Sequence, residues 1–141
     1  MAALGHRILS KYGIAYLATV RGDGGPRVHP VCPVIVDGGL YIGIIPTSPK
    51  RSDLDRDGRY VLHALPGPND AEFAVTGRAR RLTADEVDHL AATAGPNVRL
   101  SAESAMYELE IGRVNTTQYE RGPESVPLPT RSRWLADRGS G

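Results

Sequence analysis

The chain has 141 residues, of which 40% are hydrophobic, and a formal net charge of +1. This length fits one domain with a single core. The near-zero charge argues against nucleic acid or an anionic membrane as a partner. The apolar runs are of strand length, so no membrane span is expected, and the first ten residues lack the apolar core of a secretory signal. These features predict a soluble, cytoplasmic protein.

Few residues in the sequence have the spacing of a catalytic or metal-binding motif. Cys32 is the only cysteine, which excludes an internal disulfide and a cysteine-rich metal site. The four histidines share no HxxxH or HxH spacing, so no metal site is expected. No nucleophile elbow, dinucleotide-binding glycine motif or Walker motif is present. The catalytic residues are therefore unknown, and in an enzyme the chemistry would belong to a bound cofactor.

The pattern of apolar residues predicts a mainly β (α+β) protein in which short strands are joined by turns rich in glycine and aspartate. The predicted strands span residues 14–21, 27–36, 40–45, 59–65, 72–82, 105–111 and 114–120. The predicted helices span residues 2–12, 49–57 and 83–93. Six or seven short strands with two or three short helices favour a small antiparallel β-barrel.

Local residue patterns add detail to these elements. The first three strands are expected to form a meander, and the prolines of 27–36 place part of that strand at an edge or in a bulge. Thr83 and Glu86 predict a capping box at the start of the third helix. Residues 1–122 are expected to form the barrel domain, and residues 123–141 a Pro- and Arg-rich surface tail.

The segment 46–54 is the strongest candidate for a binding site. Ser48 suits the N-cap of a helix, where its hydroxyl would accept from a first-turn amide, and Pro49 suits the first helical position. Free amides and the helix dipole at such a start attract an anion, and Thr47, Lys50 and Arg51 add hydroxyl and charged groups. An ordinary helix start with solvated cations is the alternative. The aspartates of this helix, Asp53, Asp55 and Asp57, are expected to face solvent.

Two further groups of basic residues have two interpretations each. Strand alternation places Arg27 and His29 on one face of 27–36, where they could bind a phosphate or a polar ring edge or simply face solvent. Arg78 and Arg80 share a face of 72–82, and either solvation or contact with a phosphate or carboxylate would suit them.

Several short sequence motifs occur in an order that resembles the pyridoxamine 5′-phosphate oxidase-like family. They are Leu-Ala-Thr-Val at 17–20, Asp-Gly-Gly-Pro-Arg-Val-His-Pro-Val at 23–31, Leu-Tyr-Ile at 40–42, Ser-Pro-Lys-Arg-Ser-Asp-Leu at 48–54, Asp-Gly-Arg-Tyr-Val at 57–61 and Thr-Gly-Arg-Ala at 76–79. The resemblance covers residues 8–120. The family consists of FMN-binding split β-barrels, and a sister branch uses the deazaflavin coenzyme F-420.

This resemblance implies a homodimer that holds the cofactor in a groove between its subunits. Carried over by position, one set of residues would line the flavin and the other would bind its phosphate. The first set is Arg27, Val28, His29 and Pro30, and the second is Thr47, Ser48, Lys50 and Arg51. The C-terminal arginine motif of true pyridoxamine phosphate oxidases is not evident, since Arg131, Arg133 and Trp134 occupy that region. Oxidation of vitamin B6 is therefore not expected.

Three functions follow from these observations. The first is an oxidoreductase that uses FMN, or alternatively the deazaflavin, to move hydride to or from a small organic substrate. The longer anionic tail of the deazaflavin could meet extra arginines such as Arg56, Arg78 or Arg80. The second is a non-catalytic flavin carrier or redox sensor. The third, a nucleic-acid module, lacks the aromatic residues that would stack on bases beside the arginines of 77–81.

Overall fold

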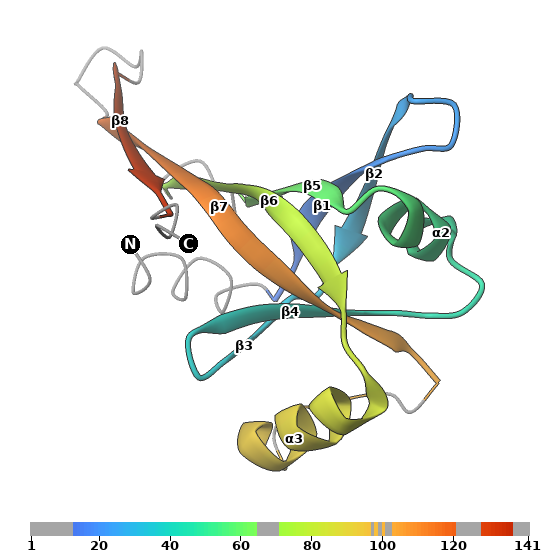
Figure 1. Ribbon diagram of the computed structural model, residues 1–141. Coiled ribbons are helices and arrows are strands. Elements are labelled where there is room, and N and C mark those ends of the chain that lie inside the picture. Colours follow the sequence, from blue (N-terminus) through green and yellow to red (C-terminus); the bar gives the residue numbers. More distant parts are fainter. Residues whose placement is uncertain are drawn as a thin grey trace.

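The computed structural model describes residues 13–64, 71–96, 98, 100, 103–120 and 128–136. Within them, eight antiparallel strands form one sheet, with the order β2-β1-β5-β6-β7-β4-β3 and with β8 beside β7 (Figure 1). The strands are β1 (Ala15–Val20), β2 (Pro26–Val31), β3 (Val34–Val36), β4 (Gly39–Ile44), β5 (Arg59–Ala64), β6 (Glu72–Arg81), β7 (Ala105–Glu120) and β8 (Leu128–Leu135). The helices are α2 (Pro49–Arg56) and α3 (Ala84–Ala94). The helix expected at 2–12 lies outside the described residues.

The strand expected at 27–36 is divided into β2 and β3, which end the sheet path on opposite sides. Only Cys32 and Pro33 separate them, so this short segment connects the strands at the two ends of the curled sheet. Pro33 has no amide hydrogen to continue a ladder, which explains the break. Both hairpins of the expected meander are present, because β2 pairs with β1 and β3 pairs with β4, but the expectation of one continuous second strand is wrong. The fold is the split β-barrel that the sequence predicts.

β7 is one strand where the sequence predicts two, at 105–111 and 114–120. It pairs with β6 along one edge, and with β4 and then β8 along the other. The register between β6 and β7 shifts at a bulge between Thr76 and Gly77, and β6 stays paired with β7 on both sides of it. A Cβ at Gly77 would overlap the carbonyl oxygen of Glu110, so glycine permits this close approach.

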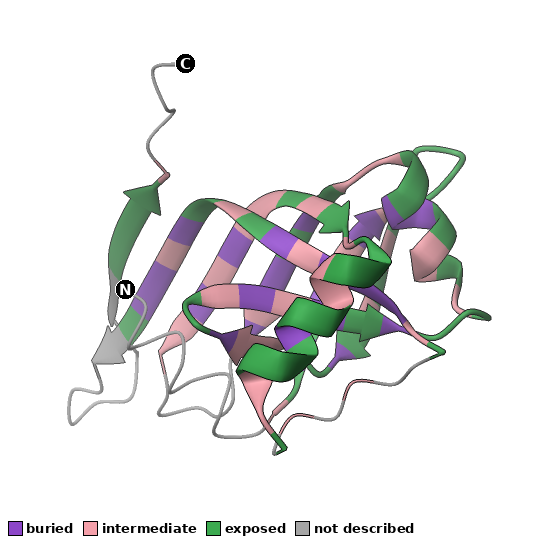
Figure 2. Ribbon diagram, turned by 60° about the horizontal axis from the view of Figure 1, so that its bottom comes forward, coloured by how far each residue is buried: buried purple, intermediate pink, exposed green. Residues whose placement is uncertain are grey.

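The core fills the inside of the curled sheet. Along strands such as β1 and β5, buried residues alternate with half-buried or exposed ones, which Figure 2 shows as alternating colours. Leu17, Ile42, Leu62, Val75 and Leu109 are almost completely buried. Each such side chain contributes roughly 1.5–3 kcal/mol relative to an exposed one.

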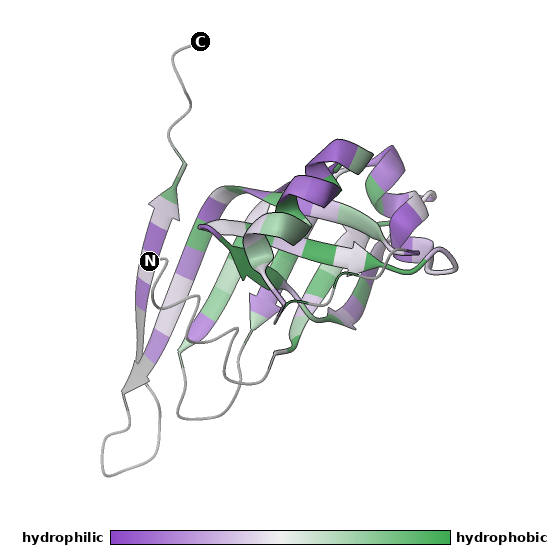
Figure 3. Ribbon diagram, turned by 90° about the horizontal axis from the view of Figure 1, so that it is seen from below, coloured by the Kyte–Doolittle hydropathy of each residue, from purple (hydrophilic) through white to green (hydrophobic). Residues whose placement is uncertain are grey.

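Both helices lie outside the sheet; α2 carries mostly hydrophilic residues, whereas α3 mixes hydrophilic residues with alanines, Val87 and Leu90 (Figure 3). α2 packs against β1 through Leu54, and α3 packs near β3 through Leu90. The predicted capping box at Thr83 and Glu86 is present at the start of α3. None of the helices in the described residues has the length and apolar character needed to cross a membrane.

Candidate functional site

Asp53 joins α2 to the first hairpin. Its side chain is buried, with 3% of the residue exposed. Its Oδ2 accepts hydrogen bonds from the Thr19 hydroxyl of β1 at 2.8 Å and from Nε of Arg27 on β2 at 2.7 Å. Its Oδ1 accepts from Arg56 at 3.3 Å. One carboxylate therefore fixes the positions of β1, β2 and α2.

The expectation that Asp53 faces solvent is wrong, because these hydrogen bonds replace the water that the carboxylate loses. Burial opposes ionisation of Asp53, but the hydrogen bonds from Thr19 and Arg27 outweigh it and hold its pKa below the ordinary value. Asp53 is consequently an anion at neutral pH, and a buried anion with three donors is stable.

Arg27 and Lys50 come together beside this anchor. Arg27 binds Asp53 through Nε, and within the described part of the chain its two Nη groups make no hydrogen bond. Partial burial and the nearby charge of Arg27 lower the pKa of Lys50. Across the described residues, Lys50 has no carboxylate partner. Two cations from β2 and from the start of α2 thus share a half-buried position in which a further negative charge would be stabilising.

The helix α2 begins at the residue that the sequence predicts. Ser48 is the N-cap, with φ −77° and ψ 130°, and Pro49 is the first helical residue. The Ser48 side chain makes no capping hydrogen bond, so that part of the expectation is wrong. The amide of Arg51 instead donates to the backbone oxygen of Ser48 at 3.1 Å. The Ser48 hydroxyl and the exposed Thr47 therefore remain available to a ligand.

Arg51 lies on the side of α2 that faces Tyr107. The Tyr107 hydroxyl donates to Asp55 at 2.6 Å and lies 3.5 Å from the backbone oxygen of Arg51. Burial and the hydrogen bond to Asp55 raise the pKa of Tyr107, while the charges of Arg81 and Arg51 oppose the rise. The structure thus brings Arg27 and Lys50 together and places Arg51 near a different group.

The four candidate residues of β2 point to two faces. Arg27 and His29 are half-buried on the face of Val31, as strand alternation predicts. Val28 and Pro30 lie on the opposite face, and Val28 is 61% exposed. A ligand on either face would contact two of the four side chains, and a ligand at the open edge of β2 would reach the backbone polar groups of alternate residues.

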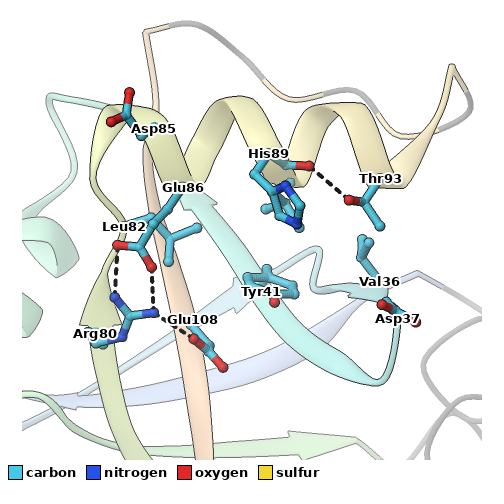
Figure 4. Close-up of a pocket in the computed structure, with 11 residues that line it drawn as sticks. Val36, Asp37, Tyr41, Arg80, Leu82, Asp85, Glu86, His89, Thr93 and Glu108 are labelled. Atoms are coloured by element: carbon cyan, nitrogen blue, oxygen red, sulfur yellow. Dashed lines mark hydrogen bonds and ion pairs between the residues drawn. The ribbon is translucent and has the colours of Figure 1, made fainter.

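Arg80 is held in an ion-pair network beneath α3. It binds Glu86 at 2.8 Å and Glu108 at 2.9 Å, and its Nε lies 3.2 Å from Glu110. Figure 4 shows this network at one end of a pocket of about 370 Å³ between α3 and β4. Because three carboxylates surround it, Arg80 is not available to an anionic ligand. Arg78, two residues earlier, is exposed.

The sequence did not indicate that Thr19, Asp53 and Tyr107 make the hydrogen bonds that hold α2 in place. One signal for Thr19 was present, since alternation along β1 places it on the same face as the buried Ala15 and Leu17. A buried hydroxyl needs a hydrogen-bond partner. No local pattern indicates that this partner is Asp53, which lies 34 residues away.

No family model matches the chain, and no curated protein matches it. Solved structures do. The chain is similar to a heme-binding protein from Mycobacterium smegmatis, with a TM-score of 0.64, 19% identity and coverage of 92% of this chain and 57% of the other. It therefore spans just over half of that protein.

Two further structures match along most of both chains. One, from Clostridium acetobutylicum, is related to general stress protein 26 of Bacillus subtilis, of the pyridoxinephosphate oxidase family. It has a TM-score of 0.70, 10% identity and coverage of 96% and 94%. The other is PhzG from Burkholderia lata in complex with tetrahydrophenazine-1-carboxylic acid, with a TM-score of 0.63, 15% identity and coverage of 95% and 89%. The chain therefore has the split-barrel fold of pyridoxamine 5′-phosphate oxidase-like proteins.

Proposed function

We propose that the protein binds FMN with its phosphate between β2 and the start of α2, and that it acts as an oxidoreductase on a small organic substrate. The observation that carries this proposal is the pair of Arg27 and Lys50. Lys50 is partly buried beside a like charge, and no described carboxylate neutralises it. A phosphate would offset both positive charges and complete the electrostatics of the site.

The chemistry of the surrounding groups fits a phosphate monoester. The Nη groups of Arg27 form a planar fork that suits phosphate oxygens, and Lys50 supplies a point charge. The start of α2 has no side-chain cap, so the amide of Lys50 and the hydroxyls of Thr47 and Ser48 can donate to the same anion. Asp53 holds Arg27 in position from behind, which lowers the entropy lost on binding.

The flavin ring would lie along the open edge of β2. Among the described strands, β2 pairs only with β1, so its other edge carries the free backbone polar groups of every second residue of 27–30. Flavin and deazaflavin rings carry carbonyl and N–H groups in one plane, which suits a strand edge. This position gives one alternate set of these residues a role through the backbone, to which Pro30 can contribute a carbonyl group but no amide.

The same region supports a homodimer. Val28 and Val61 both stand opposite Ala18 on the outer face of the sheet, and Tyr16 is 54% exposed there. An exposed apolar face of this kind is typical of a protein–protein interface. A second copy packed on it would cover the open edge of β2 and shield a bound ring from water.

A bound flavin supplies hydride chemistry at its ring, and the residues of this chain hold and orient it. Because both cofactors carry a phosphate and a tricyclic ring, the deazaflavin remains the alternative to FMN. The non-catalytic carrier is the alternative to the enzyme, and it differs in one measurable respect: the reduced complex would not be reoxidised by any small organic acceptor.

Titration of the purified protein tests the proposal. Fluorescence quenching with FMN, and separately with the deazaflavin, should give a Kd in the micromolar range or below for one of them. Lys50→Gln should weaken that Kd at least tenfold, about 1.4 kcal/mol. Arg133→Gln, which removes an exposed charge from β8, is the matched control and should leave Kd unchanged.

Heme is a third titrant, because one structural neighbour is described as a heme-binding protein. Saturable heme binding without binding of either flavin-type cofactor would overturn the proposal. Equal affinity of wild type and Lys50→Gln for FMN would place the phosphate elsewhere.

A further inference from the structure

A second basic cleft lies at the other end of α2, with a volume of about 490 Å³. It forms where the turn after β1, the end of α2, the start of β5 and the middle of β6 meet. Its charged lining residues are Arg21, Arg56, Arg59, Arg78 and Asp57. Four arginines thus surround a single described carboxylate, so the cleft has an excess of positive charge.

Two of these arginines oppose each other across the sheet. Arg59 of β5 and Arg78 of β6 are direct cross-strand partners. Like charges in this position destabilise an antiparallel pair. Asp57 neutralises Arg59 at 2.7 Å, and Glu110 of β7 stands opposite Arg78 on its other side. Glu110 lies 3.2 Å from Arg80, however, and Arg78 forms no ion pair with any described residue, so an anion beside it would meet an unpaired guanidinium group.

Two arginines are also fixed in position. Arg56 donates to the backbone oxygen of Val20 at 3.1 Å and to Asp53 at 3.3 Å, and its guanidinium lies against Gly22. Arg59 binds both carboxylate oxygens of Asp57. Because these contacts set the direction of both guanidinium groups, a ligand would lose little side-chain entropy by binding them.

Arg78, which forms no ion pair with any described residue, differs in this respect from the next arginine on the same face of β6. Arg80 lies two residues beyond Arg78 and is surrounded by three glutamates. Arg21 pairs with Asp23 at 3.3 Å, but both side chains are about half exposed or more, so solvent weakens the pair. Arginine forks bind phosphate and carboxylate groups in pairs of hydrogen bonds.

We propose that this cleft binds a small, freely diffusing anion that carries at least two phosphate or carboxylate groups. One group lies between Arg59 and Arg78, and a second is held by Arg21 and Arg56 on the opposite wall. Two glycines of the lining, Gly22 and Gly58, leave their backbone amides open to the ligand, whereas the amide of Gly24 donates to the backbone oxygen of Arg21 at 2.9 Å. The site is separate from Lys50 and does not rest on the proposed flavin function.

Nuclear magnetic resonance of the ¹⁵N-labelled protein tests this site with pyrophosphate as the probe. Pyrophosphate should shift the amide signals of Gly22 and Gly58, and it should bind at least tenfold more tightly than inorganic phosphate. Arg78→Gln should weaken pyrophosphate binding at least tenfold. Lys50→Gln should leave these shifts intact, and so should Arg133→Gln, which removes the same charge from β8.

Three results would contradict the proposal that an anion binds in this cleft. They are shifts confined to the start of α2, shifts that do not saturate, and an equal loss of affinity in Arg133→Gln, which would indicate diffuse attraction. The affinity of Arg78→Gln for FMN should equal that of wild type. The two proposals can therefore fail independently of each other.

Discussion

Lys50 occupies a position that disfavours its positive charge in the free protein. Partial burial and the charge of Arg27 both disfavour its protonated form, which lowers its pKa from the ordinary value of 10.5. A lysine with a lowered pKa destabilises the fold wherever it stays protonated. The penalty is complete below the folded-state pKa and disappears as the pH rises from that value towards 10.5.

Lys50→Met should therefore stabilise the free protein. The melting temperature at pH 7 should rise by about 1–2 °C, the usual effect of a small surface change in a chain of this length. The gain should shrink as the pH approaches 10.5, because wild type then loses the unfavourable proton. Thermal melts at pH 7 and pH 10 test this, and a lower melting temperature for the variant at pH 7 would contradict it.

Asp53 has the opposite role, since its charge stabilises the fold. Asp53→Asn removes the charge from a carboxylate that accepts from Thr19, Arg27 and Arg56. The expected cost is about 2–3 kcal/mol in the free energy of unfolding at neutral pH. Asp88→Asn on the exposed surface of α3 should cost less than about 0.5 kcal/mol.

The sign of the pH dependence follows from the lowered pKa of Asp53. The stabilisation is complete above the unfolded-state value of 3.8 and is lost as the pH falls through the folded-state pKa. The difference between wild type and Asp53→Asn should therefore be constant from pH 5 to pH 7 and decrease below pH 3.8. Urea denaturation at each pH measures it, and a difference that does not change with pH would show that packing, not charge, is lost.

At this scale, sequence reasoning succeeded where the rules are local. Ser48 and Pro49 were placed correctly because capping depends on residues next to one another. The role of Asp53 was missed because its partners come from β1 and β2, and a helix of eight residues has too few apolar positions to reveal its buried face. Residues 27–30 were grouped by resemblance, and only the strand geometry separates their side chains.

Among the elements, the contact between β6 and β7 depends most on a single residue. Gly77 sits at the bulge, where a Cβ would overlap the carbonyl oxygen of Glu110 and approach the amide of Gly112 to 3.0 Å. Gly77→Ala should cost about 3 kcal/mol, because backbone atoms cannot move aside as a flexible side chain can.

Gly38→Ala is the matched control for this change. Gly38 has φ +79°, and no atom of another residue lies within 4 Å of a Cβ added at this position. The substitution should cost about 1 kcal/mol through backbone strain alone. Urea midpoints of both variants test the comparison, and an equal loss of stability would mean that the close approach at Gly77 is not tight.

The elements themselves were predictable because turns and alternation are local signals. The hairpin turns at 22–25 and 37–39 follow from their glycines and aspartates, and the capping box of α3 follows from Thr83 and Glu86. The pairing of β1 with β5 and of β4 with β7 was not predictable in this way. These pairs join strands that are distant in sequence, and β7 continues past Gly112, which has no registered partner in β6, with further strands paired along its other edge.

At the scale of the whole molecule, the outer face of β2, β1 and β5 carries exposed apolar side chains that a partner could cover. Val28→Glu would place a carboxylate on this face, opposite Ala18. If a homodimer forms there, the substitution should weaken dimerisation at least tenfold. Leu135→Glu, at a position 57% exposed on β8, is the control and should leave the dimer intact.

Sedimentation equilibrium of the two variants and of wild type measures this directly. A wild type that stays monomeric at high concentration would contradict the dimer, and so would a Val28→Glu variant that dimerises as wild type does. The pattern of short strands and helices indicated a small antiparallel β-barrel, and the order of several short motifs that resembles a known family narrowed this to the split β-barrel. The division of the chain at residue 122 stays a prediction, and β8 lies beyond that division.

The proposal that Arg27 and Lys50 bind the phosphate of FMN is tested most directly by a ³¹P nuclear magnetic resonance titration of FMN bound to the protein. A phosphate monoester takes up its second-step proton near pH 6. A phosphate held between Arg27 and Lys50 should keep its dianionic form to a clearly lower pH, because both cations favour the charged form. The Lys50→Gln complex should titrate closer to free FMN. A bound phosphate that titrates as free FMN does in the wild-type protein would contradict binding at this pair.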